Sequence, residues 1–137
     1  MKKSFIKTSG WVLLTALFVF LFSANLAGLV GIYDYIVISG SMEPSIPTGS
    51  VAVVDHNVPF DDIQVGDVII FKCDDMNIIH RVVGETVVNG QKRLSTKGDA
   101  NEREDDFITT EENYCGKALF HIEKLGYALD FKGWIKK

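Results

Sequence analysis

Hydrophobic residues follow two different patterns along this chain. Residues 8–33 carry no charge and are mostly apolar. As an α-helix this run would be about 39 Å long at about 1.5 Å per residue, which exceeds the hydrocarbon thickness of a bilayer, about 30 Å. The pattern predicts a membrane-spanning helix over residues 9–33, preceded by a short N-terminus over residues 1–8 and followed by a separate domain over residues 34–137.

Beyond Asp34 the apolar residues come in short runs that are rich in β-branched side chains and bounded by Gly, Pro, Asp or Asn. Runs of this kind are typical of β-strands. We predict strands over residues 35–39, 50–55, 67–72, 77–83 and 119–125. Asn89-Gly90 predicts a hairpin between two further runs, because both residues tolerate positive φ. The domain is therefore expected to be mainly β, with a long acidic loop over residues 99–113.

Charge favours one orientation of the predicted span. Lys2, Lys3 and Lys7 precede it, whereas every acidic residue lies beyond it. By the positive-inside rule we expect the N-terminus in the cytoplasm and residues 34–137 outside it. A cleaved signal peptide is the alternative, but its apolar stretch usually covers only about 7–15 residues. We therefore expect a single-pass anchor in the cell membrane, or in the endoplasmic reticulum membrane of a eukaryote.

The part of the chain beyond the span is more acidic than the whole, whose formal net charge is −4, because three of the 14 basic residues precede the span. An acidic surface disfavours nucleic acid and anionic lipid as partners. Cys73 and Cys115 both lie on the predicted exported side, where a disulfide is permitted. Two buried thiols are the alternative, and the sequence does not separate the two.

Ser41 is the candidate nucleophile, in the segment Ser39-Gly40-Ser41-Met42-Glu43-Pro44. A serine hydroxyl attacks a carbonyl only when a base takes its proton and donors stabilise the oxyanion. Gly40 allows close approach of the backbone, and the Ser41 amide and the Ser39 hydroxyl are candidate oxyanion donors. Met42 is a further candidate for substrate binding. The alternative is that these small polar residues simply form a turn.

His80 is the candidate base for this serine. Alternation along its strand puts it on the same face as Ile78 and Val82, so that a polar ring lies among apolar neighbours. The alternative is a core histidine whose ring bonds a backbone carbonyl. His56 is expected in an exposed turn. His121 lies in the last predicted strand, and no neighbouring residue indicates a catalytic role for it.

Four segments resemble, in order and spacing, the motif boxes of the type I signal peptidases. They are residues 39–54, 66–71, 80–83 and 96–101. The chain is most similar to the branch of the endoplasmic reticulum, archaea and Gram-positive sporulation enzymes, which has histidine where the commoner bacterial enzymes have lysine. The resemblance implies a coiled antiparallel β-sheet catalytic domain with an N-terminal transmembrane helix. It also implies a serine endopeptidase that removes signal peptides from exported preproteins.

The resemblance further implies Ser41 as nucleophile and His80 as general base, oriented by an acidic residue. Asp99 and Asp105 both match acidic positions of the family, and Asp106 stands beside the second. Which carboxylate contacts His80 stays open. No metal or cofactor is implied. The expected partners are exported preproteins with signal peptides and the lipid bilayer, and additional subunits are neither implied nor excluded.

Two other classes of protein are weighed against this resemblance. Self-cleaving SOS repressors share a Ser-Met motif and a related catalytic fold, but they use a lysine base and carry a DNA-binding head. A catalytically inactive, membrane-anchored β-domain that binds or chaperones exported or pilus-type partners is the second alternative. The presence of Ser41, His80 and Asp99 together argues against a loss of activity.

Overall fold

The computed structural model describes residues 11–16, 18–19 and 30–129. The chain divides into two units, with the boundary between Gly31 and Ile32. Within the described residues, no helix combines the length and the apolar character needed to span a bilayer. Most of the predicted span, residues 9–33, lies outside the described residues.

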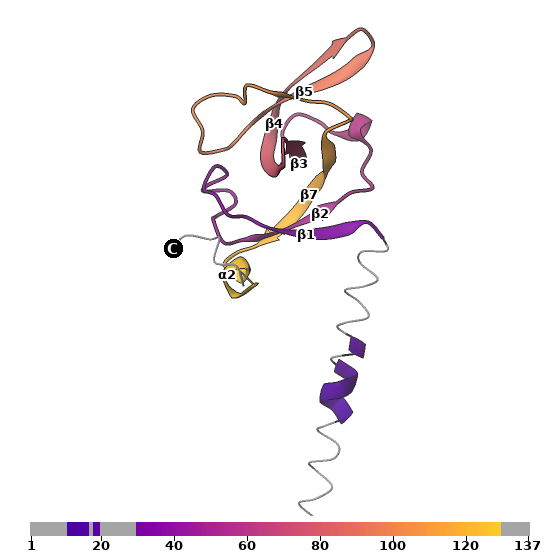
Figure 1. Cartoon of the computed structure of the whole chain (residues 1–137), viewed down its shortest axis with the longest axis vertical. Coiled ribbons are helices and arrows are strands. Elements are labelled where there is room, and N and C mark those ends of the chain that lie inside the picture. The colour runs from indigo at the N-terminus through magenta and orange to yellow at the C-terminus, as the bar shows by residue number, and fades with distance from the viewer. Residues whose placement is uncertain (1–10, 17, 20–29, 130–137) are drawn as a thin grey trace, which may run out of the picture. The chain divides into compact units, whose positions relative to one another are not determined.

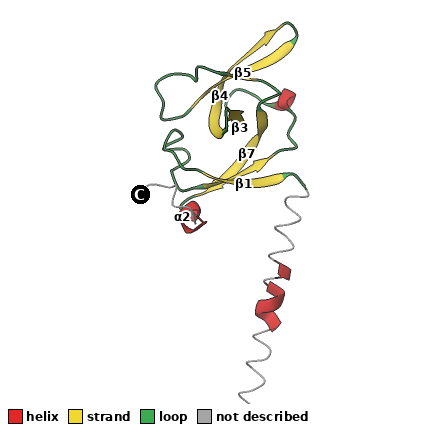
Figure 2. Ribbon diagram, in the orientation of Figure 1, coloured by secondary structure: helices red, strands yellow, loops and turns green. Residues whose placement is uncertain are grey.

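Among the described residues of the second unit, seven strands form one antiparallel sheet (Figure 1). They are β1 (Ile32–Ile36), β2 (Val51–Asp55), β3 (Val68–Cys73), β4 (Met76–Val88), β5 (Gln91–Lys97), β6 (Ile108–Thr109) and β7 (Tyr114–Ile122). Their order across the sheet is β1-β2-β7-β3-β4-β5-β6. A 3-10 helix, η1 (Phe60–Asp62), follows β2, and the short helix α2 (Leu125–Leu129) follows β7 (Figure 2). The prediction of a mainly β, antiparallel domain is confirmed.

Three predicted strands coincide closely with β2, β3 and the first half of β4. The predicted hairpin is also confirmed, because Asn89 (φ 54°) and Gly90 (φ 79°) connect β4 to β5 as a two-residue turn. The predicted loop contains the two-residue strand β6, which pairs with β5.

The first and last predicted strands overlap β1 and β7, but their bounds are wrong. Strand β1 ends at Ile36, which pairs with Val51, and the following residues turn toward Ser41 instead of continuing to residue 39. Because β1 already begins at Ile32, the last two residues of the predicted span belong to the sheet. Strand β7 begins at Tyr114, earlier than predicted, because it pairs with both β2 and β3.

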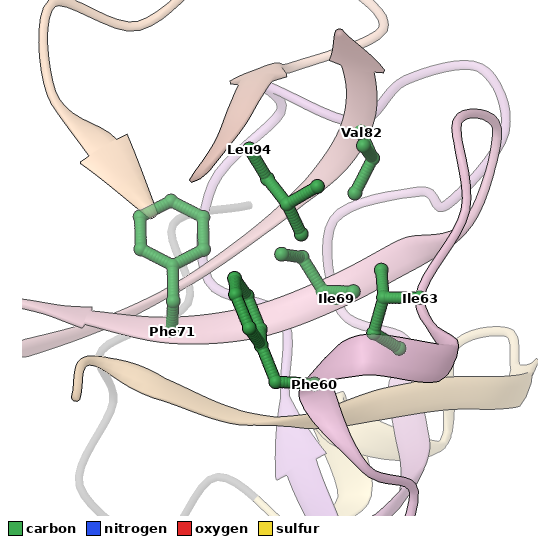
Figure 3. Packing of buried hydrophobic residues seen from close by; sticks show 6 residues of the cluster. All are labelled: Phe60, Ile63, Ile69, Phe71, Val82 and Leu94. Carbon is green, nitrogen blue, oxygen red and sulfur yellow. The ribbon is translucent and has the colours of Figure 1, made fainter. Parts of the chain in front are cut away.

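Two apolar clusters cover opposite faces of the central strands. The first, whose side chains converge in Figure 3, consists of Phe60, Ile63, Ile69, Phe71, Val82 and Leu94. The second consists of Val37, Met42, Ile46 and Ala52, with Val68 and Ile79 packed against it. The adjacent residues Val68 and Ile69 thus pack in different clusters, because successive side chains of a strand point to opposite faces of the sheet. Because Met42 and Ile46 are buried, the segment that follows Ser41 is anchored in the core.

Candidate active site

Ser41 lies in the turn that connects β1 to β2. The base of this turn is closed by two backbone hydrogen bonds, from Val37 N–H to Ser50 O (2.9 Å) and from Gly49 N–H to Val37 O (2.8 Å). The side chain of Met42 packs into the second cluster, directly after Ser41. The position of the Ser41 hydroxyl is therefore fixed from both sides, by a closed turn and by a buried neighbour.

The imidazole of His80 meets this hydroxyl, with Nε2 3.0 Å from Ser41 Oγ. His80 lies in β4, paired with Ile69 of β3, and only 6% of the residue is exposed. Its ring stands edge-on to that of Phe71, with 6.4 Å between the ring centroids. The apolar surroundings hold the ring between the core and the serine.

The other ring nitrogen of His80 meets Asp105, with Nδ1 2.7 Å from Oδ2. Thr96, which is fully buried, donates its hydroxyl hydrogen to the same oxygen at 2.6 Å. The backbone N–H of Asp105 also donates to Thr96 O at 2.8 Å. A carboxylate that accepts from Nδ1–H keeps the proton of a neutral imidazole on that nitrogen, so that Nε2 is free to accept the Ser41 proton.

Asp99 faces a different partner. Both of its carboxylate oxygens accept hydrogen bonds from Arg81, at 2.9 Å from Nε and 2.7 Å from Nη2. These bonds hold the pKa of Asp99 below its usual value, while burial opposes the shift and a hydrogen bond from Ser45 adds to it. Of the three acidic residues considered from sequence, Asp105 contacts His80, Asp99 pairs with Arg81, and Asp106 is exposed.

The turn after β5 approaches the backbone of Ser41. Ala100 N–H donates to Ser41 O at 2.9 Å. A Cβ atom at Gly98 would lie 2.5 Å from Ser41 O and 3.0 Å from His80 Nε2. Position 98 therefore accommodates only glycine without displacing one of the two residues, because Cβ atoms do not approach a backbone oxygen so closely.

The other predicted site residues lie in different environments. Ser39 Oγ is 3.4 Å from Ser41 Oγ, on the exposed side of the turn. Met42 is fully buried, so its side chain belongs to the core and not to the surface beside Ser41. His56 Nε2 lies 3.0 Å from Tyr35 Oη, and His121 pairs with Ala52 in the sheet.

The two cysteines are free thiols in this structure, and both are partly buried. Burial raises the pKa of the Cys115 thiol above its usual value. The sequence left a disulfide and two thiols as alternatives, and the structure has the thiols.

Sequence reasoning did not single out Thr96, Arg81 or Gly98 as part of this arrangement. Thr96 had a detectable signal, because alternation puts its polar side chain on the same face of β5 as Leu94, which is buried. The importance of Gly98 depends on how closely the turn after β5 approaches Ser41, which becomes visible only in the folded chain.

His80 links the Ser41 hydroxyl to the Asp105 carboxylate by two hydrogen bonds, of 3.0 Å at Nε2 and 2.7 Å at Nδ1. This is the arrangement of a serine hydrolase site. The family described as "Signal peptidase, peptidase S26" matches residues 5–119 of this sequence. The chain therefore belongs to the signal peptidase family.

Relatives of named function include the "Signal peptidase complex catalytic subunit SEC11" of Eremothecium gossypii, which is 34% identical over 103 residues, covering 67% of this chain and 60% of the relative. The SEC11 subunit of Ogataea parapolymorpha is 31% identical over 112 residues, covering 67% and 62%. "Signal peptidase I W" of Bacillus subtilis is 38% identical over 78 residues, covering 56% and 41%. These similarities confirm the predicted branch, and the chain spans about three fifths or less of the length of these relatives.

Proposed function

We propose that this protein is a membrane-bound serine endopeptidase that removes N-terminal signal peptides from exported preproteins. The observation that carries the proposal is the hydrogen-bonded line Ser41–His80–Asp105 in a member of the signal peptidase family. The relatives named as signal peptidase and as signal peptidase catalytic subunit support the same substrate class.

In the first half of the reaction, Ser41 Oγ attacks the carbonyl carbon of the scissile peptide bond while His80 Nε2 takes the hydroxyl proton. Asp105 stabilises the imidazolium that forms, through the hydrogen bond at Nδ1. The C–N bond then breaks, and His80 returns the proton to the leaving amine, which becomes the N-terminus of the mature protein. The signal peptide remains as an ester on Ser41.

In the second half, His80 Nε2 takes a proton from water while the oxygen of that water attacks the ester carbon. The ester bond breaks, Ser41 Oγ recovers its proton from His80, and the signal peptide leaves with a new carboxylate. The backbone N–H of Ser41 and the hydroxyl of Ser39, whose Oγ is 3.4 Å from Ser41 Oγ, are the proposed donors to the oxyanion in both halves.

We further propose that the uncharged N-terminal segment anchors the protein, with the catalytic domain outside the cytoplasm. Even a fully extended link at about 3.3 Å per residue would leave Ser41 within about 23 Å of Asp34. The scissile bond of a preprotein emerges just beyond its own apolar segment, at a similar height. Anchoring enzyme and substrate in one bilayer raises their effective concentration and limits their relative orientations.

The test is cleavage of a secretory preprotein by the full chain in detergent-solubilised membranes, followed by N-terminal sequencing of the product. We expect the unmodified protein to release the mature N-terminus, and Ser41→Ala and His80→Ala to release none while keeping the circular dichroism of the folded protein. Full activity in either variant contradicts the assigned roles. Absence of cleavage by the unmodified protein contradicts the proposed activity.

A further inference from the structure

Helix α2 rests on the backbone of the turn that carries Ser41. Gly126 N–H donates a hydrogen bond to Gly49 O at 2.8 Å. A Cβ atom at Gly126 would lie 2.7 Å from that oxygen and 3.0 Å from Cγ2 of Ile36. The backbones of the two glycines are therefore in direct contact, and a side chain at position 126 would push α2 away from the turn.

The ring of Tyr127, the residue after Gly126, packs on Gly49. A Cβ atom at Gly49 would overlap three carbons of the Tyr127 ring. Gly49 also has a φ of +81°, which side-chain-bearing residues rarely adopt. The ring thus occupies the space that a side chain would fill, and packs directly on the backbone of Gly49.

Gly49 is a structural residue of the turn that carries the nucleophile. Its N–H donates a hydrogen bond to Val37 O, which closes the base of the turn. Ser41 lies between these two residues in the sequence. The far side of the turn is held by Ala100, whose N–H donates to Ser41 O. The turn that carries Ser41 is therefore held by two segments. The loop after β5, which also carries Asp105, bonds Ser41 itself, and α2, near the C-terminal end of the described residues, bonds Gly49.

We propose that Tyr127 and Gly126 are positioning residues for Ser41. By fixing Gly49, α2 holds the base of the turn and thereby the 3.0 Å separation of Ser41 Oγ and His80 Nε2. A misplacement of about 1 Å in a reacting group is enough to lower a rate by orders of magnitude. The inference rests on the proposed function, since it assigns these two residues a part in the reactivity of Ser41.

The test compares Tyr127→Ala with Tyr127→Phe, which keeps the ring and removes only the hydroxyl. Preprotein cleavage gives kcat and KM, and the rate of Ser41 modification by a small fluorophosphonate reports on the hydroxyl without using the substrate-binding surface. We expect Tyr127→Ala to lower kcat and the modification rate about tenfold or more, with KM within about twofold. Tyr127→Phe should match the unmodified protein.

Gly126→Ala is the second variant, and we expect it to resemble Tyr127→Ala. Gly84→Ala is its matched control, because a Cβ atom there would meet Ser95 Cβ at 3.4 Å, an ordinary contact remote from α2. All assays are run well below the thermal unfolding midpoint of each variant, so that unfolding does not lower the rates. Hydrogen exchange of peptides covering residues 37–50 gives a readout that needs no activity, and it should accelerate in Tyr127→Ala and Gly126→Ala only.

Unchanged kcat, unchanged modification rate and unchanged exchange in Tyr127→Ala would overturn the inference. A rise in KM with kcat preserved would also overturn it, because Tyr127 would then bind substrate instead of supporting Ser41. If the unmodified protein neither cleaves nor reacts at Ser41, the proposed function fails, while the exchange of residues 37–50 still decides whether α2 holds the turn.

Discussion

Arg81 holds Asp99 through both carboxylate oxygens, with separations of 2.9 Å and 2.7 Å. Arg81 is the neighbour of His80 in β4, so the two side chains leave the strand on opposite faces. One acidic residue, Asp105, thus meets the imidazole, and the other, Asp99, ties the turn after β5 to the strand that carries this imidazole. The two carboxylates are six positions apart in sequence and have different partners.

This division predicts unequal effects of removing the two charges. We expect Asp105→Asn to lower kcat about a thousandfold or more, because its amide NH2 favours the imidazole tautomer in which Nε2 is protonated and unable to accept the Ser41 proton. Asp99→Asn leaves the contact between His80 and Asp105 in place. The factor by which it lowers kcat should therefore be at least ten times smaller than the factor for Asp105→Asn. Preprotein cleavage by the two variants measures the difference, and equal losses would contradict the separate assignments.

The stability contributed by Asp99 should depend on pH. Hydrogen bonds from Arg81 lower the pKa of Asp99 in the folded protein, so the folded state favours the charged carboxylate. That stabilisation is fully present above the ordinary aspartate pKa of about 3.9 and is lost as the pH falls through the lowered pKa of the folded state. We expect Asp99→Asn to reduce the free energy of unfolding by about 1–2 kcal/mol at pH 7.

Urea unfolding of the unmodified protein and of Asp99→Asn, at pH 7 and at successively lower pH, measures this term. The difference between the two proteins should shrink as the pH is lowered through the acidic range. A difference that stays constant from pH 7 down to the acid limit of folding would show that the Arg81–Asp99 charge interaction is not its source.

Thr96 should support the reaction through Asp105. Thr96→Val keeps the shape of the side chain and removes the hydroxyl that donates to Asp105 Oδ2 at 2.6 Å. We expect kcat to fall about tenfold, because the carboxylate loses a fixed donor worth about 1.5 kcal/mol and is less well oriented toward His80. Thr96→Ser, which retains the hydroxyl, is the control. Equal kcat in Thr96→Val and the unmodified protein would exclude this role.

Gly98 should tolerate no side chain. A Cβ atom there would lie within 3.0 Å of both Ser41 O and His80 Nε2, so Gly98→Ala has to displace the nucleophile or the base. We expect about a hundredfold loss of kcat, in line with the effect of small displacements of reacting groups. Gly84→Ala should retain activity, since Ser95 leaves room for the added methyl group. A fully active Gly98→Ala would mean that the turn after β5 is not held against Ser41.

Local chemistry explains which parts of the fold were predictable. The hairpin at Asn89-Gly90 is encoded by two residues that accept positive φ, and β2 and β3 by short β-branched runs between turn residues. The limits of β1 and β7 are set instead by pairing. Strand β1 ends at Ile36, because its partner Val51 is the first residue of β2. Strand β7 is long because it pairs with both β2 and β3, and no local pattern encodes either pairing.

The candidate site was also predictable only in part. Ser41 and His80 are predictable because their segments match the motifs of the signal peptidases in order and spacing, since a serine in a turn or a histidine in a strand does not by itself indicate a site. The structure places Ser41 Oγ 3.0 Å from His80 Nε2. The partner of His80 was not predictable, because it depends on the path of the loop between β5 and β6. That path is fixed by the backbone hydrogen bond from Asp105 N–H to Thr96 O and by the Arg81–Asp99 ion pair, and neither contact is encoded by a local pattern of the sequence.

The most direct test of the central claim is to identify the residue that carries the signal peptide during cleavage. A preprotein is mixed with the protein, the reaction is quenched in acid, and the covalent adduct is located by mass spectrometry. We predict an ester between the signal peptide and Ser41, absent in Ser41→Ala and strongly reduced in His80→Ala. An adduct on another residue, or processing of the preprotein by Ser41→Ala, would contradict the account.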